Sequence, residues 1–288
     1  MDQKIIDLYD AYTHSRIDRR TFMDRLAGLA GGTAAAAALL PLLKADKAAA
    51  AIVPADDERL ETDYVAYPAP SGEVRAFRAK PRDAAGPLPG VLVIHENRGL
   101  NPHIEDVARR AALAGFVALA PDALSPMGGT PEDEDRAREM IGQLNAQETV
   151  ANLAAGVTWL SQQPDSNGRV GVVGFCWGGG MSGAVAAENP EGLAAAVVFY
   201  GRTVPEERVS SIEVPLLLHY AGLDQNINAN VPAFQEALDA AEVDYTLHMY
   251  EGANHAVHND TSEARYDQQA AELAWSRTIA FFEERLQG

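Results

Sequence analysis

The chain has 288 residues and carries 41 Asp and Glu against 23 Lys and Arg, which gives a formal net charge of -18. Binding to a phosphate backbone needs clustered basic residues, so this composition argues against a nucleic-acid partner. The single cysteine excludes an intramolecular disulfide framework and a zinc-thiolate cluster. A hydrophobic content of 47% is enough to form a sizeable core, so the bulk of the chain is expected to fold.

The first 51 residues differ from the rest of the chain. Arg19 and Arg20, followed by a spacer and Phe22, precede eighteen uncharged residues over 26–43. This order is typical of a twin-arginine export signal, and the small residues at 48–51 would suit cleavage. The pattern predicts a periplasmic or otherwise exported protein, with the twin-arginine export machinery as a partner and a mature domain over 52–288. The alternatives are a membrane anchor formed by residues 26–43 and a soluble amphipathic helix in a cytoplasmic protein.

Residues 52–288 alternate short apolar runs with longer amphipathic ones. We predict a hairpin and six further strands, at residues 64–67 with 73–79, and at 91–95, 117–120, 170–173, 194–200, 216–220 and 245–250. Helices are predicted between them, at residues 103–114, 132–160, 181–188, 232–241 and 262–286. This alternation predicts one α/β domain with a mostly parallel central sheet and helices on both faces.

The most specific motif lies at residues 170–180. It consists of a strand that leads through Gly174-x-Cys176-x-Gly178 into a helix, which is the nucleophile-elbow pattern with cysteine in the serine position. The nucleophile of an elbow occupies a strained turn, and side chains two residues before and after it would collide with neighbouring backbone. The start of the following helix also favours a thiolate. The alternative is a buried, unreactive cysteine beside a glycine-rich turn.

Two later positions complete a predicted triad. Asp224 lies four residues beyond the strand at 216–220, and His255 lies five residues beyond the strand at 245–250. An elbow nucleophile is followed in the chain by an acid and then by a histidine, each after a later strand. Cys176, Asp224 and His255 have this order, although Asp224 or His255 alone is also readable as a turn or surface-loop residue.

No metal-binding role is predicted for the histidines. His255, His258 and Asp260 lie close in sequence, but they lack the one-face helical spacing of metal-binding histidine motifs, so no metal site is predicted. His219 and His248 fall inside predicted strands, and we expect both to be core histidines that bond to backbone groups.

The sequence resembles the dienelactone hydrolase family of α/β-hydrolases from about residue 63 onward. The resemblance is strongest in four stretches, at residues 93–99, 166–179, 199–201 and 252–255. It implies a triad formed by Cys176, Asp224 and His255, and a glutamate, Glu96, that lies against the thiol and helps to generate the thiolate. Tyr200, at one of these strand ends, is a candidate for substrate contact.

Together these residues predict hydrolysis of a small ester or lactone through a thioester acyl-enzyme, with no cofactor. His255, held by Asp224, would accept the thiol proton, and Glu96 could be the first acceptor. The backbone N–H groups of Trp177 and Asn97 would stabilise the oxyanion. The alternatives are a non-catalytic binding module on the same scaffold and use of the thiolate in acyl transfer or redox chemistry.

The resemblance also bears on the substrate. Characterised members of the family hold a substrate carboxylate with two arginines, and the positions in this chain are Asn259 and either Arg136 or Arg138. With asparagine at the first position, Arg98 and Arg202, which also follow strands, are candidate replacements. We therefore predict an ester or lactone of unspecified acid rather than dienelactone itself.

Overall fold

The computed structural model describes residues 1–14, 16–44 and 51–287. The strands are Leu60–Ala69 (β1), Gly72–Pro81 (β2), Leu88–Ile94 (β3), Val117–Pro121 (β4), Ser166–Phe175 (β5), Leu193–Phe199 (β6), Leu216–Ala221 (β7) and Tyr245–Tyr250 (β8). They form one eight-stranded sheet in the order β1-β2-β4-β3-β5-β6-β7-β8. The hairpin β1-β2 and the pair β2-β4 are antiparallel, and every other pair is parallel. The predicted α/β fold with a mostly parallel sheet is confirmed.

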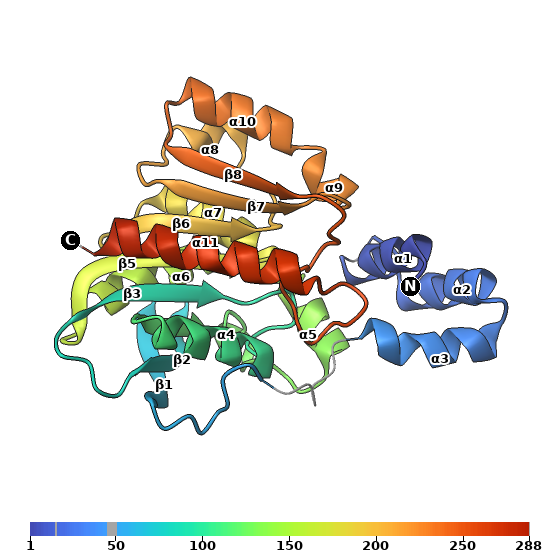
Figure 1. The fold of residues 1–288 in the computed structure, drawn as a ribbon, viewed down its shortest axis with the longest axis horizontal. Helices are drawn as coiled ribbons and strands as arrows, with labels where there is room; N and C mark the ends of the chain where they lie inside the picture. Colours follow the sequence, from blue (N-terminus) through green and yellow to red (C-terminus); the bar gives the residue numbers. More distant parts are fainter. Residues whose placement is uncertain (15, 45–50, 288) are drawn as a thin grey trace.

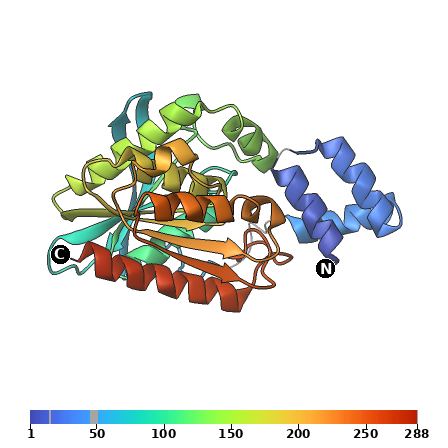
Figure 2. The ribbon, with the colours of Figure 1, turned by 90° about the horizontal axis from the view of Figure 1, so that it is seen from above.

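Helices cover both faces of the sheet (Figures 1 and 2). One face packs against α4 (Pro102–Leu113) and α11 (Gln268–Leu286), and the other packs against α6 (Ala146–Ser161), α7 (Trp177–Glu188), α8 (Glu206–Val209) and α10 (Val231–Ala240). Strand β3 shows how the sequence produces these two layers. Its Val91 and Val93 point into the first layer, whereas Leu92 and Ile94 point into the second. A strand that is buried on both faces therefore appears as a continuous apolar run.

The helix expected at 181–188 begins earlier, at Trp177, and two other predicted helices differ more from the structure. The expected helix at 132–160 is divided into α5 (Glu134–Ile141) and α6, because Asn145 caps a new helix by accepting a hydrogen bond from Glu148 N. The expected helix at 262–286 begins only at 268, where Asp267 caps α11. Three further helical turns, Ser125–Met127 (η1), α8 and Gln225–Asn228 (α9), are too short to produce a periodic pattern.

The N-terminal segment, residues 1–44, contains three helices: Gln3–Thr13 (α1), Arg19–Ala30 (α2) and Thr33–Leu43 (α3). The uncharged stretch at 26–43 is broken at Gly31 and Gly32, whose φ angles of 82° and 146° favour glycine. Helices α2 and α3 meet there at 110°. No single helix of the described residues is long and apolar enough to cross a membrane, whereas α2 and α3 together have the length and composition of a bent span. The export signal stays a prediction, and residues 48–50 of its cleavage region lie outside the described residues.

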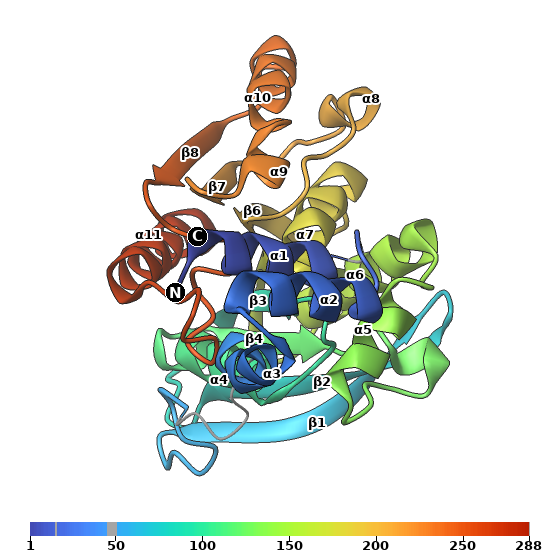
Figure 3. The same cartoon turned by 90° about the vertical axis from the view of Figure 1, so that its right-hand side faces the viewer.

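This segment packs beyond the carboxyl ends of the parallel strands (Figures 1 and 3). It has its own small apolar cluster, which includes Tyr9, Tyr12 and Phe22. Its contacts with the rest of the protein are largely polar: Gln3 Nε2 lies 2.6 Å from Asn254 Oδ1, Tyr12 Oη 2.9 Å from Asp135 Oδ1, Arg265 Nη1 3.2 Å from Asp10 Oδ1, and Asn97 Nδ2 2.8 Å from the Thr13 carbonyl oxygen. The segment therefore lies over the edge of the sheet where the predicted site residues gather.

Candidate active site

Cys176 stands in the turn between β5 and α7 with a φ of 54°, a strained conformation for a residue with a side chain. The two glycines of the motif make this turn possible. A Cβ atom at Gly174 would lie 1.9 Å from the Gly178 carbonyl oxygen, and one at Gly178 would lie 2.4 Å from the His95 carbonyl oxygen. These are the backbone collisions that the elbow motif predicts, and they fix the thiol at the carboxyl edge of the sheet.

Asp224 and His255 come from the next two strand ends. Asp224 caps α9 after β7, His255 lies in the loop after β8, and His255 Nδ1 is 2.5 Å from Asp224 Oδ2. Both side chains are buried. Nε2 of His255 forms no hydrogen bond among the described residues, and His255 lines the same cavity as Cys176. The sheet thus brings the three predicted triad residues to one site.

Electrostatics favours a thiolate at this position. Burial opposes the charged form, but the positive charges of His255 and His14 outweigh it and lower the pKa of Cys176 to about 6. Burial alone would lower the pKa of His255, yet the thiolate and the Asp224 carboxylate raise it well above its usual value. Burial raises the pKa of Asp224, and its bonds to His255 more than offset this, so that it stays lowered. The favoured state is a thiolate beside an imidazolium.

Glu96 has a different environment from the one that the resemblance implies. Its carboxylate accepts a hydrogen bond from Asn259 Nδ2 at 2.6 Å, and the Tyr200 hydroxyl lies 3.5 Å away. The hydrogen-bond partner of the Cys176 thiol is instead His14 Nε2, 3.4 Å from Sγ. The expected contact between glutamate and thiol is therefore corrected, because Asn259 holds Glu96 and a histidine of the N-terminal segment occupies the place beside sulfur.

Asn259 stands at the expected clamp position and is engaged within the protein. It is buried, and while its amide nitrogen donates to Glu96, its Oδ1 accepts from Thr261 N at 3.1 Å and from Thr261 Oγ1 at 2.6 Å. Both ends of the amide are thus engaged within the protein. Contact between Asn259 and a substrate stays a prediction.

The thiol opens into a cavity of about 890 Å³. Apolar side chains form much of its wall: Ile141, Val150, Met181, Ala184, Val204 and Ile227. Tyr200 also lines it, as expected of a substrate-contact candidate. Such a cavity can bury a small, largely apolar acyl group beside the sulfur.

The candidate arginines are separated by the structure. Arg202 lines the cavity, is exposed, and has no hydrogen-bond or ion-pair partner among the described residues. Arg138 also lines it, but its guanidinium donates to the Tyr12 carbonyl oxygen and lies over the Tyr12 ring. Arg136 and Arg98 are absent from the cavity lining: Arg136 is exposed on α5, and Arg98 is half-buried with its Nε 3.9 Å from Glu134 Oε2. Substrate contact by Arg98 or Arg136 therefore has no support from the cavity lining, and Arg202 is the one of the four candidate arginines that lines the cavity without a protein partner among the described residues.

The predicted oxyanion donors are at the correct edge of the sheet. Trp177 is the first residue of α7, so its N–H has no partner within the helix. Asn97 follows β3, and its N–H donates no backbone hydrogen bond in the described part of the chain. Both residues line the cavity with Cys176. Their N–H groups are therefore available to an oxyanion on a substrate carbonyl that is bound beside the thiol.

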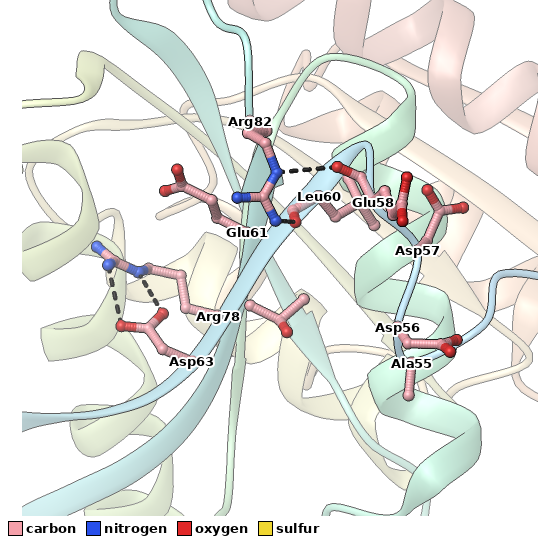
Figure 4. A pocket seen from close by; sticks show the side chains of 10 residues that line it. Ala55, Asp56, Asp57, Glu58, Leu60, Glu61, Asp63, Arg78 and Arg82 are labelled. Atoms are coloured by element: carbon pink, nitrogen blue, oxygen red, sulfur yellow. Dashed lines mark hydrogen bonds and ion pairs between the residues drawn. The ribbon is translucent and has the colours of Figure 1, made fainter.

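A second cavity, of about 530 Å³, lies beside β1 (Figure 4). Five carboxylate residues and two arginines line it: Asp56, Asp57, Glu58, Glu61, Asp63, Arg78 and Arg82. Arg78 pairs with Asp63 at 3.0 Å, and Arg82 donates to backbone carbonyl groups. Its described lining includes neither a cysteine nor a histidine, so we place the active site at Cys176.

One group of described residues could approach a metal ion together: the ligand atoms of His14, Cys176 and His255 lie within 4.8 Å of one another. We interpret this group as a hydrogen-bonded thiol with two histidines. The sequence cluster at 255–260 is arranged differently, because the His258 ring stacks on Phe175 and Asp260 is bonded to Arg110 and His103.

The two strand histidines differ from each other. His219 is buried and bonds to side chains rather than to backbone: Thr278 Oγ1 is 3.2 Å from its Nε2, and the Tyr250 hydroxyl is 2.9 Å from its Nδ1. His248 is only half-buried on β8. The expected backbone partner is therefore wrong for His219, and the expected core position is wrong for His248.

Comparisons with known proteins identify the family of this chain. A model of the dienelactone hydrolase family matches residues 74–286. A carboxymethylenebutenolidase homologue from Escherichia coli O157:H7 is 31% identical over 251 residues, which cover 82% of this chain and 92% of that protein. The chain belongs to the dienelactone hydrolase family. The crystal structure of a dienelactone hydrolase homologue from Klebsiella pneumoniae is similar, with a TM-score of 0.70 at 28% identity over 78% of this chain and 98% of that chain.

This dienelactone hydrolase family member is a hydrolase that acts on esters. The dienelactone hydrolase-like promiscuous phosphotriesterase P91 from metagenomic libraries has the same fold, with a TM-score of 0.71 at 24% identity over 79% of this chain and 99% of that chain. A separate family model, described as YqhI-like, matches residues 1–32. The resemblance found in the sequence is confirmed, and the N-terminal segment lies outside the region that the dienelactone hydrolase model covers.

His14 is the site residue that sequence reasoning missed. It follows α1 in a segment that was interpreted as a possible leader, 162 positions before the cysteine that it contacts. No motif or strand end marks it. Only the packing of the segment over the sheet edge brings its imidazole to the thiol.

Proposed function

We propose that this protein hydrolyses small esters or lactones by covalent catalysis, with Cys176 as nucleophile, His255 as acid and base, and Asp224 as the residue that orients His255. The observation that carries this proposal is a strained-turn thiol that shares one cavity with a buried His255–Asp224 pair. The three groups have the roles that nucleophilic catalysis requires, namely a nucleophile, a base and a third group that holds the base.

The reaction follows from these positions. The thiolate attacks the carbonyl carbon, and the tetrahedral oxyanion accepts hydrogen bonds from the N–H groups of Trp177 and Asn97, each worth about 3 kcal/mol. Protonated His255 gives its proton to the leaving alkoxide, which leaves a thioester on Cys176. A water molecule that His255 deprotonates then attacks the thioester and releases the acid. No step requires a cofactor.

Trapping of the acyl-enzyme tests this function directly. We expect intact-mass spectrometry, after brief mixing with p-nitrophenyl acetate and a panel of activated esters and lactones, to find one acyl group on the wild-type chain. The adduct should map to Cys176 and be absent from Cys176→Ala. An intact fold with no adduct and no turnover across the panel would favour a non-catalytic binding module instead.

The acid part of the substrate is expected to meet Arg202. A charge-assisted hydrogen bond to a substrate carboxylate would favour an anionic ester over a neutral one. We expect Arg202→Gln to lower kcat/KM about tenfold for a carboxylate-bearing p-nitrophenyl ester. The loss is limited because the side chain is exposed and solvent screens its charge. The kcat/KM for p-nitrophenyl acetate should stay almost unchanged, because this ester has no carboxylate for Arg202 to bind. Steady-state kinetics on the ester pair measures this selectivity.

Arg136→Gln is the matched control, because Arg136 is an exposed arginine outside the cavity. Its selectivity between the two esters should equal that of the wild type. An equal loss on both esters in Arg202→Gln would show that this arginine does not recognise the carboxylate.

A further inference from the structure

The N-terminal segment places a second histidine at the nucleophile. His14 Nε2 lies 3.4 Å from Cys176 Sγ, whereas Nε2 of His255 has no hydrogen-bond partner among the described residues. The two imidazole rings meet edge to face, with their centroids 4.5 Å apart. The thiol therefore has one histidine hydrogen-bonded to it and another beside it.

The orientation of His14 is fixed from behind. Its Nδ1 lies 2.8 Å from the Asp10 carbonyl oxygen, one turn earlier in α1, so Nδ1 carries a proton and donates. In the neutral ring Nε2 then presents its lone pair to the sulfur. Because carbonyl groups at the C-terminus of a helix favour a positive charge, the end of α1 also suits His14 once it is protonated.

The end of α1, just before His14, is held by contacts with the rest of the protein. The Asp10 carboxylate pairs with the buried Arg265, and the Thr13 carbonyl oxygen accepts a hydrogen bond from Asn97 Nδ2. The cavity beside the thiol still measures about 890 Å³ with His14 as part of its wall. The segment therefore lines the site and leaves room for a substrate.

We propose that His14 is a catalytic residue of this hydrolase: its imidazole generates and holds the Cys176 thiolate before the substrate binds. The N-terminal segment is then part of the active site. The proton of the thiol passes from Sγ to Nε2 of His14, and the sulfur keeps the electron pair. The resulting imidazolium donates a hydrogen bond back to the thiolate. His255, whose positive charge also stabilises the thiolate, serves the leaving group and the water. This inference rests on the proposed role of Cys176 as nucleophile.

Glu96 does not compete for this role in the structure, because Asn259 and Tyr200 engage its carboxylate. The other titratable or charged groups around the thiol and His14 come from every neighbouring element: Asp10, Glu96, Arg138, Tyr200, Asp224, His255 and Arg265. All of them are unchanged when His14 alone is replaced, so a difference between the two proteins reports on His14.

The test is the pH dependence of thiol alkylation in the full-length protein. Iodoacetamide reacts with the thiolate, and the adduct is followed by intact mass from pH 5 to 9. The wild type should titrate near pH 6. In His14→Gln, which keeps a hydrogen-bonding side chain but has no basic nitrogen, the midpoint should rise by about one unit or more, so that alkylation below pH 6 falls about tenfold.

His248→Gln is the matched control. His248 is also half-buried, but it lies on β8 outside the cavity. Its alkylation curve should coincide with that of the wild type. Hydrogen exchange of the α1 amides shows whether the segment stays docked in His14→Gln. An unchanged midpoint with α1 still protected would overturn the proposal.

If α1 loses its protection in His14→Gln, rescue of His14→Ala by added imidazole decides the question. Recovery of alkylation at pH 6 supports the proposal, and no recovery overturns it. The outcomes for function and for His14 are separable because alkylation needs no ester. A shifted midpoint without ester turnover would remove the proposed function alone, whereas turnover through Cys176 with an unshifted His14→Gln curve would remove the role of His14 alone.

Discussion

Replacing Cys176 by alanine is expected to lower kcat/KM for p-nitrophenyl acetate by at least about a thousandfold. In the proposed mechanism Cys176 supplies the atom that forms the thioester, so no neighbouring group can substitute for it. His255 and the two backbone N–H groups would remain, and they account for whatever rate persists. Steady-state kinetics with purified wild-type and variant protein measures the loss.

The fold should tolerate this change. Cys176 is buried, but alanine also has a Cβ atom and lacks only the sulfur. The melting temperature is therefore expected to stay within a few degrees of that of the wild type. Cys176→Ser replaces the thiol by a hydroxyl, a weaker nucleophile, and its activity should lie between those of the wild type and Cys176→Ala. Activity of Cys176→Ala close to the wild-type value would mean that hydrolysis uses another residue.

Gly174→Ala is expected to destabilise the protein by at least about 3 kcal/mol. The new Cβ would lie 1.9 Å from the Gly178 carbonyl oxygen, a backbone atom that cannot move away without separating β5 from the start of α7. The cost is larger than that of ordinary overpacking because no flexible side chain can yield. Urea unfolding followed by circular dichroism measures it, and failure to obtain soluble protein is the extreme form of the same result.

Gly86→Ala is the control for this substitution. Gly86 has no atom within 4 Å of the position that a Cβ would take, so its unfolding free energy should change by no more than about 0.5 kcal/mol. Equal stability of Gly174→Ala and Gly86→Ala would show that the elbow does not need the close approach of β5 and α7.

The sequence was informative wherever a local rule fixes the structure. Period and composition located the strands, since a buried parallel strand is apolar on both faces, as Leu92 and Val93 illustrate. The elbow glycines could be found because steric exclusion acts over two residues. The order of Cys176, Asp224 and His255 follows from the sheet, whose successive parallel strands all end at the same edge.

Local patterns failed where partners come from distant parts of the chain. The break between α5 and α6 depends on a cap at Asn145 that an amphipathic pattern conceals. The candidate arginines could not be ranked from the sequence, because only packing shows that Arg138 is bonded to the Tyr12 carbonyl oxygen whereas Arg202 lines the cavity without such a partner. Glu96 was placed by resemblance, and the structure gives its carboxylate to Asn259.

The sequence by itself determined the fold class, the family, the elbow and the order of the proposed triad residues, because each depends on spacing along the chain. Only the tertiary structure decided which side chains meet across long separations in the chain: Glu96 with Asn259, and Cys176 with His14. The amino-terminal stretch illustrates the difference. Its composition resembles a leader, yet polar contacts hold its first helix against the domain and bring an imidazole to the sulfur. Contacts of this kind depend on three-dimensional packing, for which a one-dimensional pattern contains no signal.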